Sequence, residues 1–114
     1  MPRIHHDEPY RLELHQQVVA TARDFLVGNI SVTEAARRLV GPAHELGAAF
    51  EEPFLTFVGI DSETDMFPLG EVRNNWNPDA LLREDAEREL YEASVRERAL
   101  EAAGEILQRY DTPQ

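Results

Sequence analysis

Cysteine and lysine are both absent from this chain of 114 residues, and each absence removes a class of chemistry. Without cysteine there is no disulfide, no thiolate ligand for zinc and no cysteine nucleophile. Without lysine there is no Schiff-base catalysis, and no phosphate-binding loop whose lysine contacts the bound phosphates. The lack of cysteine is also typical of a protein in a reducing interior. We therefore expect a cytoplasmic protein stabilised by its apolar core.

Long apolar runs are missing as well, since no stretch approaches the about 18 apolar residues that a membrane-spanning helix needs. The first residues, MPRIHHDEPYRLEL, carry charges where a secretory signal has its apolar segment. The sequence thus predicts a soluble chain that does not enter a membrane. Its length corresponds to a single domain over residues 1–114, with flexible ends at 1–7 and 111–114.

Negative charge is what the chain has in excess. It holds 22 acidic side chains and 11 basic ones, all arginine, for a formal net charge of −11. This charge argues against binding to nucleic acid, because contacts to backbone phosphates need a basic surface. A basic protein is the natural complement, although strong net charge also serves solubility alone. Residues 45–78 hold seven acids and one arginine, so negative charge is least compensated in the middle of the chain.

Apolar periodicity and helix-stop signals predict an all-α bundle of four or five helices. A first helix over residues 8–27 ends at Gly28. Ser31 and Glu34 match the capping box that opens a second helix. Pro42 is expected to end or kink that helix and to begin a short third one. In this third helix the inward side chains would be those of Leu46, Ala49 and Phe50.

The apolar run over residues 54–60 is compatible with a buried helix or a strand. No other segment alternates with period two, so we interpret it as helix, followed by a loop over residues 61–75. Asn77 and Pro78 then begin a helix that continues to about Tyr110. At 1.5 Å per residue this helix is about 50 Å long, more than a domain of this size accommodates. It must bend or break, most easily at residues 102–104, or project into a second subunit.

One apolar stripe follows most of the C-terminal helix. It predicts either a homodimer that buries the stripe or a bent helix that buries it within one chain. The members of the stripe are Leu82, Ala86, Leu90, Ala93, Leu100, Ala103, Leu107 and Tyr110.

The candidate interaction residues lie in the segment over residues 54–76, where carboxylates alternate with large apolar side chains. We expect the aromatic side chains to face inward and the carboxylates to face solvent. Arg73 is expected to pair with one of these carboxylates, and Trp76 either anchors the loop by burial or forms the centre of an interface. The five candidates are Asp61, Glu63, Asp65, Arg73 and Trp76.

Metal binding stays open as an alternative. The spacing of Asp61, Glu63 and Asp65 is similar to the first half of a calcium-binding EF-hand loop, but Met66 and Val72 occupy the positions of the required glycine and glutamate. No two histidines are spaced to share one helix face as metal ligands. A zinc site would have to combine His15 with a histidine from the N-terminus, His5 or His6, while His44 stands alone. The sequence indicates no catalytic residue and no cofactor.

The order SETD, PLG, Arg73 and Trp76, leading into a long helix, resembles a group of small all-helical bacterial proteins without an assigned activity. The resemblance covers about residues 30–110 and implies a helical bacterial domain. Function is therefore predicted from charge and exposure. The leading prediction is a non-enzymatic acidic module, an inhibitor or immunity-type protein for a basic partner. The alternatives are a metal-dependent protein or enzyme that uses Asp61, Glu63 and Asp65, and a helical homodimer with a structural or regulatory role.

Overall fold

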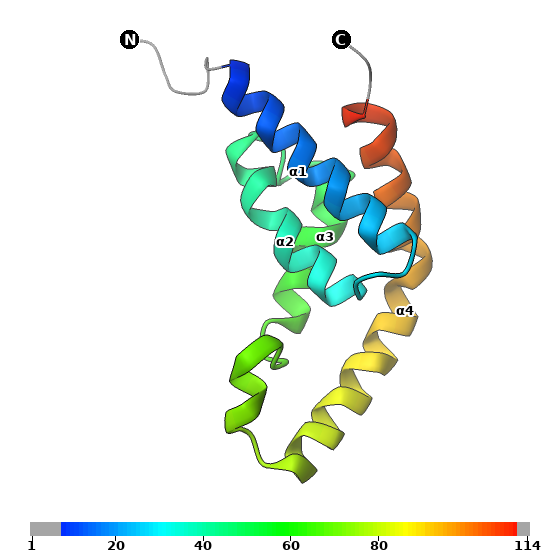
Figure 1. Cartoon of the computed structure of the whole chain (residues 1–114). Coiled ribbons are helices and arrows are strands. Elements are labelled where there is room, and N and C mark those ends of the chain that lie inside the picture. Colours follow the sequence, from blue (N-terminus) through cyan, green and yellow to red (C-terminus); the bar gives the residue numbers. More distant parts are fainter. Residues whose placement is uncertain (1–7, 112–114) are drawn as a thin grey trace.

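The computed structural model describes residues 8–111, and within that range the chain is helical without a β-strand. The helices are α1 (Glu8–Leu26), α2 (Val32–Glu45), α3 (Phe54–Thr64), the 3-10 helix η2 (Gly70–Asn75) and α4 (Pro78–Tyr110). The predicted all-α class, with its long C-terminal helix, is confirmed. In Figure 1, α1 lies across α2 and the C-terminal half of α4, and α3 lies behind α2. The ends predicted to be flexible lie outside the described residues, except Asp111, which pairs with Arg23.

The turn between α1 and α2 forms as its sequence predicts. Gly28 adopts a positive φ of 85°, which a residue with a Cβ rarely takes, and its N–H donates to the carbonyl of Phe25. Ser31 then caps α2: its hydroxyl accepts from the Glu34 N–H at 3.1 Å, and the Glu34 carboxylate accepts from the Ser31 N–H at 3.1 Å. Both interactions of the capping box are present, so the position of this helix start is encoded locally.

The prediction that Pro42 ends α2 is wrong, because the helix continues to Glu45 with the proline inside its last turn. Leu39 and Ala43 lie on either side of Pro42 and are both fully buried. Their burial holds the helix continuous across a residue that cannot donate a backbone hydrogen bond. The short third helix is also absent from the described chain. Phe50 does not face inward: it is 76% exposed and lies edge-on to His44.

The run over residues 54–60 is helical, as we interpreted it, but the predicted loop is shorter than expected. Helix α3 continues to Thr64, whose buried hydroxyl donates to the carbonyl of Ile60 at 2.6 Å. Arg37 of α2 donates to the carbonyls of Thr64 and Phe67, each at 2.7 Å, and so satisfies the end of α3. The six residues of η2 fill much of the remaining segment. The sequence lacked a signal for either extension, because both depend on contacts with distant residues.

Helix α4 runs unbroken for 33 residues from its Asn77 cap. All of its buried residues lie between Val95 and Ile106, where it packs against α1 and α3. The expected break at residues 102–104 does not occur; instead, the N-terminal half of α4 projects beyond the rest of the molecule. Figure 1 shows this half and η2 extending together below the other helices. We call residues 69–93 the arm; none of them is buried.

The arm makes the molecule elongated. Its principal extents are 52 × 29 × 22 Å, and its radius of gyration is 15.5 Å. A compact domain of this length has a radius near 13 Å. The apolar core therefore lies at one end, where Phe25 and Phe57 meet edge to face with ring centroids 6.3 Å apart. Within the described residues, no helix has the length and apolar character to cross a membrane.

Candidate interaction surface

The three candidate carboxylates lie at the end of α3. Asp61 and Glu63 belong to the helix itself, and Asp65 is its C-cap. Glu63 and Asp65 are exposed and Asp61 is half-buried, whereas Phe57 beneath them is 1% exposed. None of the three carboxylates forms an ion pair with another described residue. The aromatic side chains of α3 thus face inward, and at least two of the carboxylates face solvent.

Arg73 does not pair with those carboxylates, which corrects the prediction made from its proximity in sequence. Its two terminal nitrogens donate to the two carboxylate oxygens of Asp85 in α4, at 2.9 and 2.8 Å. It also donates to the carbonyl of Pro68 at 3.2 Å. The hydrogen bonds from Arg73 lower the pKa of Asp85, and the same bonds raise the pKa of Arg73. Arg73 therefore fastens η2 to α4, and the half-buried Trp76 follows directly after η2.

The Arg73–Asp85 pair begins a series of polar contacts along α4 that ends at the buried Thr33 of α2. Arg88 lies 3.4 Å from Asp85 and 3.7 Å from Glu92, each distance joining a guanidinium nitrogen to a carboxylate oxygen. Glu92 then accepts a hydrogen bond of 2.6 Å from the hydroxyl of Thr33, which is fully buried at the start of α2. We call these five residues the polar row. The polar row connects η2 to α4, and its hydrogen bond between Thr33 and Glu92 connects the arm to the start of α2.

On the side of α4 opposite the polar row, the half nearer the N-terminus carries exposed apolar side chains. Leu82 and Leu90 are 70% and 75% exposed, and Ala86 and Ala93 are exposed beside them. At about 100° per residue, these four positions fall within about 80° of the helix circumference, away from the buried side. We call them the outer stripe. They are the first half of the predicted stripe, which is therefore not buried within the chain.

The predicted stripe is covered only in part, because α1 and α3 pack against the half of α4 nearer the C-terminus. Leu82 and Leu100 are 18 residues apart, five full helical turns, and so lie on the same side of α4; Leu82 is 70% exposed, whereas Leu100 packs against the core. Ala103 is buried, while Leu100, Leu107 and Tyr110 lie half-buried against the core. Only the half nearer the N-terminus is left for a partner.

Charged side chains surround the outer stripe, three of them acidic and two basic. Asp79, Glu89 and Glu97 are exposed at positions adjacent to it, and Arg83 and Arg96 are exposed at its two edges. The imbalance is larger over the wider region. Between residues 63 and 92, six carboxylates are exposed, and Arg83 is the one arginine exposed to the same degree. The exposed carboxylates are those of Glu63, Asp65, Glu71, Asp79, Glu87 and Glu89. Four of these six carboxylates belong to the arm, which therefore combines uncovered leucines with a net negative surface.

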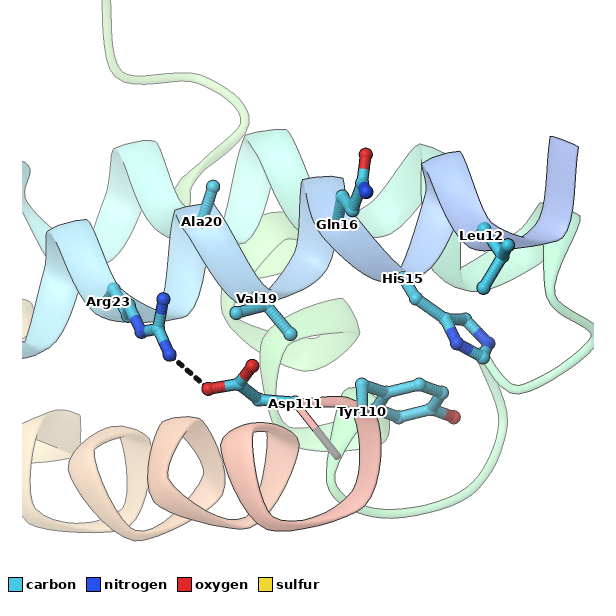
Figure 2. Close-up of a pocket in the computed structure, with 8 residues that line it drawn as sticks. All are labelled: Leu12, His15, Gln16, Val19, Ala20, Arg23, Tyr110 and Asp111. Atoms are coloured by element: carbon cyan, nitrogen blue, oxygen red, sulfur yellow. Dashed lines mark hydrogen bonds and ion pairs between the residues drawn. The ribbon is translucent and has the colours of Figure 1, made fainter. Parts of the chain in front are cut away.

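The structure gives no donor set for a metal among residues 8–111, since no group of three histidine, aspartate or glutamate side chains comes together there. His5 and His6 lie outside the described residues. His15 lies in an open pocket of about 400 Å³ between α1 and the end of α4 (Figure 2). The lining residues are Leu12, His15, Gln16, Val19, Ala20, Arg23, Tyr110 and Asp111.

His15 packs against the end of α4, and its contribution to the stability of the fold depends on pH. Its ring meets Tyr110 edge to face, with centroids 4.9 Å apart, and its buried Nε2 has no hydrogen-bond partner among the described residues. Burial lowers the pKa of His15, the nearby Arg11 lowers it further, and Glu8 opposes the shift. A histidine with a lowered pKa stabilises the fold fully above its unfolded pKa of 6.5, and this stability is lost as the pH falls below that value.

We therefore expect the melting temperature to fall as the pH is lowered from about 7.5 to about 5.5, a range in which exposed carboxylates stay ionised. His15→Phe keeps an aromatic ring against Tyr110 and removes the titration, so its melting temperature should change less over this range. His44→Phe makes the same substitution at an exposed position and serves as the control. Equal pH dependence in all three proteins would show that His15 is not responsible.

Comparison of the chain with protein-family models, with curated proteins and with solved structures gives no match. The resemblance to small bacterial proteins therefore stays a prediction, and function is argued from geometry. The structure adds two features to the five candidates: the polar row and the outer stripe. Leu82 and Leu90 were visible in the sequence as part of an apolar line, but the side of α4 that is covered follows only from the position of α1 and α3.

Proposed function

We propose that this protein is a non-enzymatic, cytoplasmic interaction module that binds a basic protein through the arm, in the manner of an inhibitor or immunity protein. The observation that carries the proposal is the outer stripe, a row of exposed leucines and alanines on a projecting helix, bordered by three carboxylates and two arginines. Apolar surface gathered on one face of a projecting element is typical of a binding site, whereas scattered apolar residues are not.

The arm is also preorganised for binding. Arg73 and Asp85 clasp η2 against α4, and Glu92 fastens α4 to the start of α2. A partner that docks on α4 therefore meets a formed helix and does not have to order it. Preorganisation of this kind reduces the entropic cost of association. The six exposed carboxylates would accelerate the encounter with a basic partner and make it sensitive to salt.

The test is capture of a basic protein from the source lysate on immobilised protein, followed by binding measurements with the purified binder. Leu82→Gln/Leu90→Gln removes the two leucines of the outer stripe without changing charge. Each buried interface leucine contributes on the order of 1 kcal/mol or more, so the double variant should bind at least about 10-fold more weakly. Added salt should weaken binding of the unmodified protein, mainly through slower association.

A matched control is available in the same chain. Val27 and Phe50 are 70% and 76% exposed, close to the values for Leu82 and Leu90, but lie outside the arm. Val27→Gln/Phe50→Gln should leave binding within about twofold of the unmodified protein, because these positions lie outside the proposed interface. If both double variants bind the partner equally, or if the captured protein is acidic and binds independently of salt, the proposal is wrong.

The uncovered outer stripe supports one further candidate, the homodimer. Two copies could bury their stripes against each other, since leucines alternate with alanines along α4. The negative surface opposes this association, because it would bring two sets of exposed carboxylates together. Light scattering at low and high salt distinguishes the two candidates. No contact among the described residues favours the metal-dependent alternative that used Asp61, Glu63 and Asp65.

A further inference from the structure

We infer that the partner docks as a basic amphipathic α-helix, laid lengthwise along the outer stripe of α4. The inference rests on the proposed function and names the chemistry of the partner. The outer stripe spans 12 residues of α4, from Leu82 to Ala93, about 16 Å along the helix axis. A partner helix of three turns covers this length. Its apolar side chains face the stripe, and its arginines and lysines face the surrounding carboxylates.

The shape of the stripe selects a helix over an extended segment. The backbone donors and acceptors of α4 are used within the helix, so α4 has no free edge to which a strand could add. Two leucines and two alanines instead alternate at positions 82, 86, 90 and 93. The leucines form ridges, and the alanines leave hollows between them that accept the side chains of a facing helix. Small residues also let two helix axes approach closely, which increases the apolar contact.

The charges next to the stripe select a partner with a basic majority. Asp79, Glu89 and Glu97 are adjacent to the four apolar positions and exposed. Arg83 and Arg96 lie at the two edges, so a partner with one acidic residue at each of those places would also be favoured. The remaining exposed carboxylates of the arm add long-range attraction. A second copy of this chain carries the same negative charge and is disfavoured at low salt.

The probe is a designed helical peptide of about 21 residues, long enough to form a helix upon docking. Leucine and alanine occupy one face, arginine occupies the borders of that face except for one glutamate on each border, and glutamine fills the rest. A second peptide has the same composition in scrambled order, without an apolar face. Binding of both peptides to the full chain is measured by titration calorimetry, and the bound surface is mapped by amide chemical shifts of the labelled protein.

We expect 1:1 binding of the amphipathic peptide, at least about 10-fold tighter than binding of the scrambled one. Shift changes should concentrate at residues 79–97. Leu82→Gln/Leu90→Gln should reduce the affinity at least about 10-fold, and Val27→Gln/Phe50→Gln should change it less than about twofold. The inference is overturned if the two peptides bind equally or if the shift changes spread over carboxylates on all sides of the protein.

Failure of this inference can be separated from failure of the proposed function. If the natural basic partner depends on Leu82 and Leu90 but the peptide does not bind the outer stripe, the helical mode is wrong and the module stands. If neither binds there, both are wrong. A dimer in light scattering that Leu82→Gln/Leu90→Gln converts to a monomer would assign the stripe to a second copy and overturn the helical-partner inference.

Discussion

Phe57→Ala is expected to lower the free energy of unfolding by about 3–5 kcal/mol, the usual cost of removing a buried phenylalanine ring. Phe57 is 1% exposed and meets Phe25 of α1 edge to face at 6.3 Å, so its removal leaves a cavity between α3 and α1. A domain of this size has a total stability of about 5–15 kcal/mol. The variant should therefore melt many degrees lower, as measured by circular dichroism or calorimetry.

Phe50→Ala provides the control, because the same chemical change is made at a position that is 76% exposed. It should change the free energy of unfolding by less than about 0.5 kcal/mol, as is usual for surface positions. Similar losses in the two variants would mean that Phe57 is not at the centre of the core. The comparison matters for function, since α3 carries the candidate carboxylates and leads into the arm.

Local signals in the sequence were sufficient for most of the helices. The capping box of Ser31 and Glu34 marks the start of α2. Asn77 marks the start of α4, because its side chain accepts from the N–H groups of Asp79 and Ala80. Such caps act within one turn and need no tertiary information. Pro42 misled the prediction because its local preference was outweighed by the burial of neighbouring residues, which no local rule contains.

The candidate site was predicted less completely, because it depends on pairings across the fold. Arg73 and Asp85 are separated by a turn and part of a helix, so proximity in sequence favoured the wrong carboxylates for Arg73. Thr33 and Glu92 are 59 residues apart, and neither carried a signal of its own. The outer stripe was recognised as apolar, but its exposure followed only from the place at which α4 leaves the other helices.

Glu92→Ala is expected to lower the free energy of unfolding by about 1.5–3 kcal/mol, the range for a hydrogen bond that involves a charged group. Glu92 accepts from the hydroxyl of Thr33 at 2.6 Å and lies 3.4 Å from its N–H, so its charge faces the start of α2. Thr33 is fully buried, and without Glu92 its hydroxyl loses this acceptor. The negative charge also interacts favourably with the helix N-terminus.

The arm should respond more strongly than the rest of the molecule, because Glu92 is where the polar row reaches α2. Hydrogen exchange in Glu92→Ala should accelerate at residues 78–92 more than at residues 95–106, where α4 is buried. Glu89→Ala, an exposed glutamate on the same helix, should stay within about 0.5 kcal/mol of the unmodified protein.

A double-mutant cycle with Thr33→Ala isolates the contact between Thr33 and Glu92. A coupling energy of about 1–2 kcal/mol is expected for two residues that hydrogen-bond directly. If the two substitutions are additive, or if Glu92→Ala and Glu89→Ala lose the same stability, Glu92 does not fasten α4 to α2. Arg73 and Asp85 could not replace this contact, because both lie within the arm and join η2 to α4.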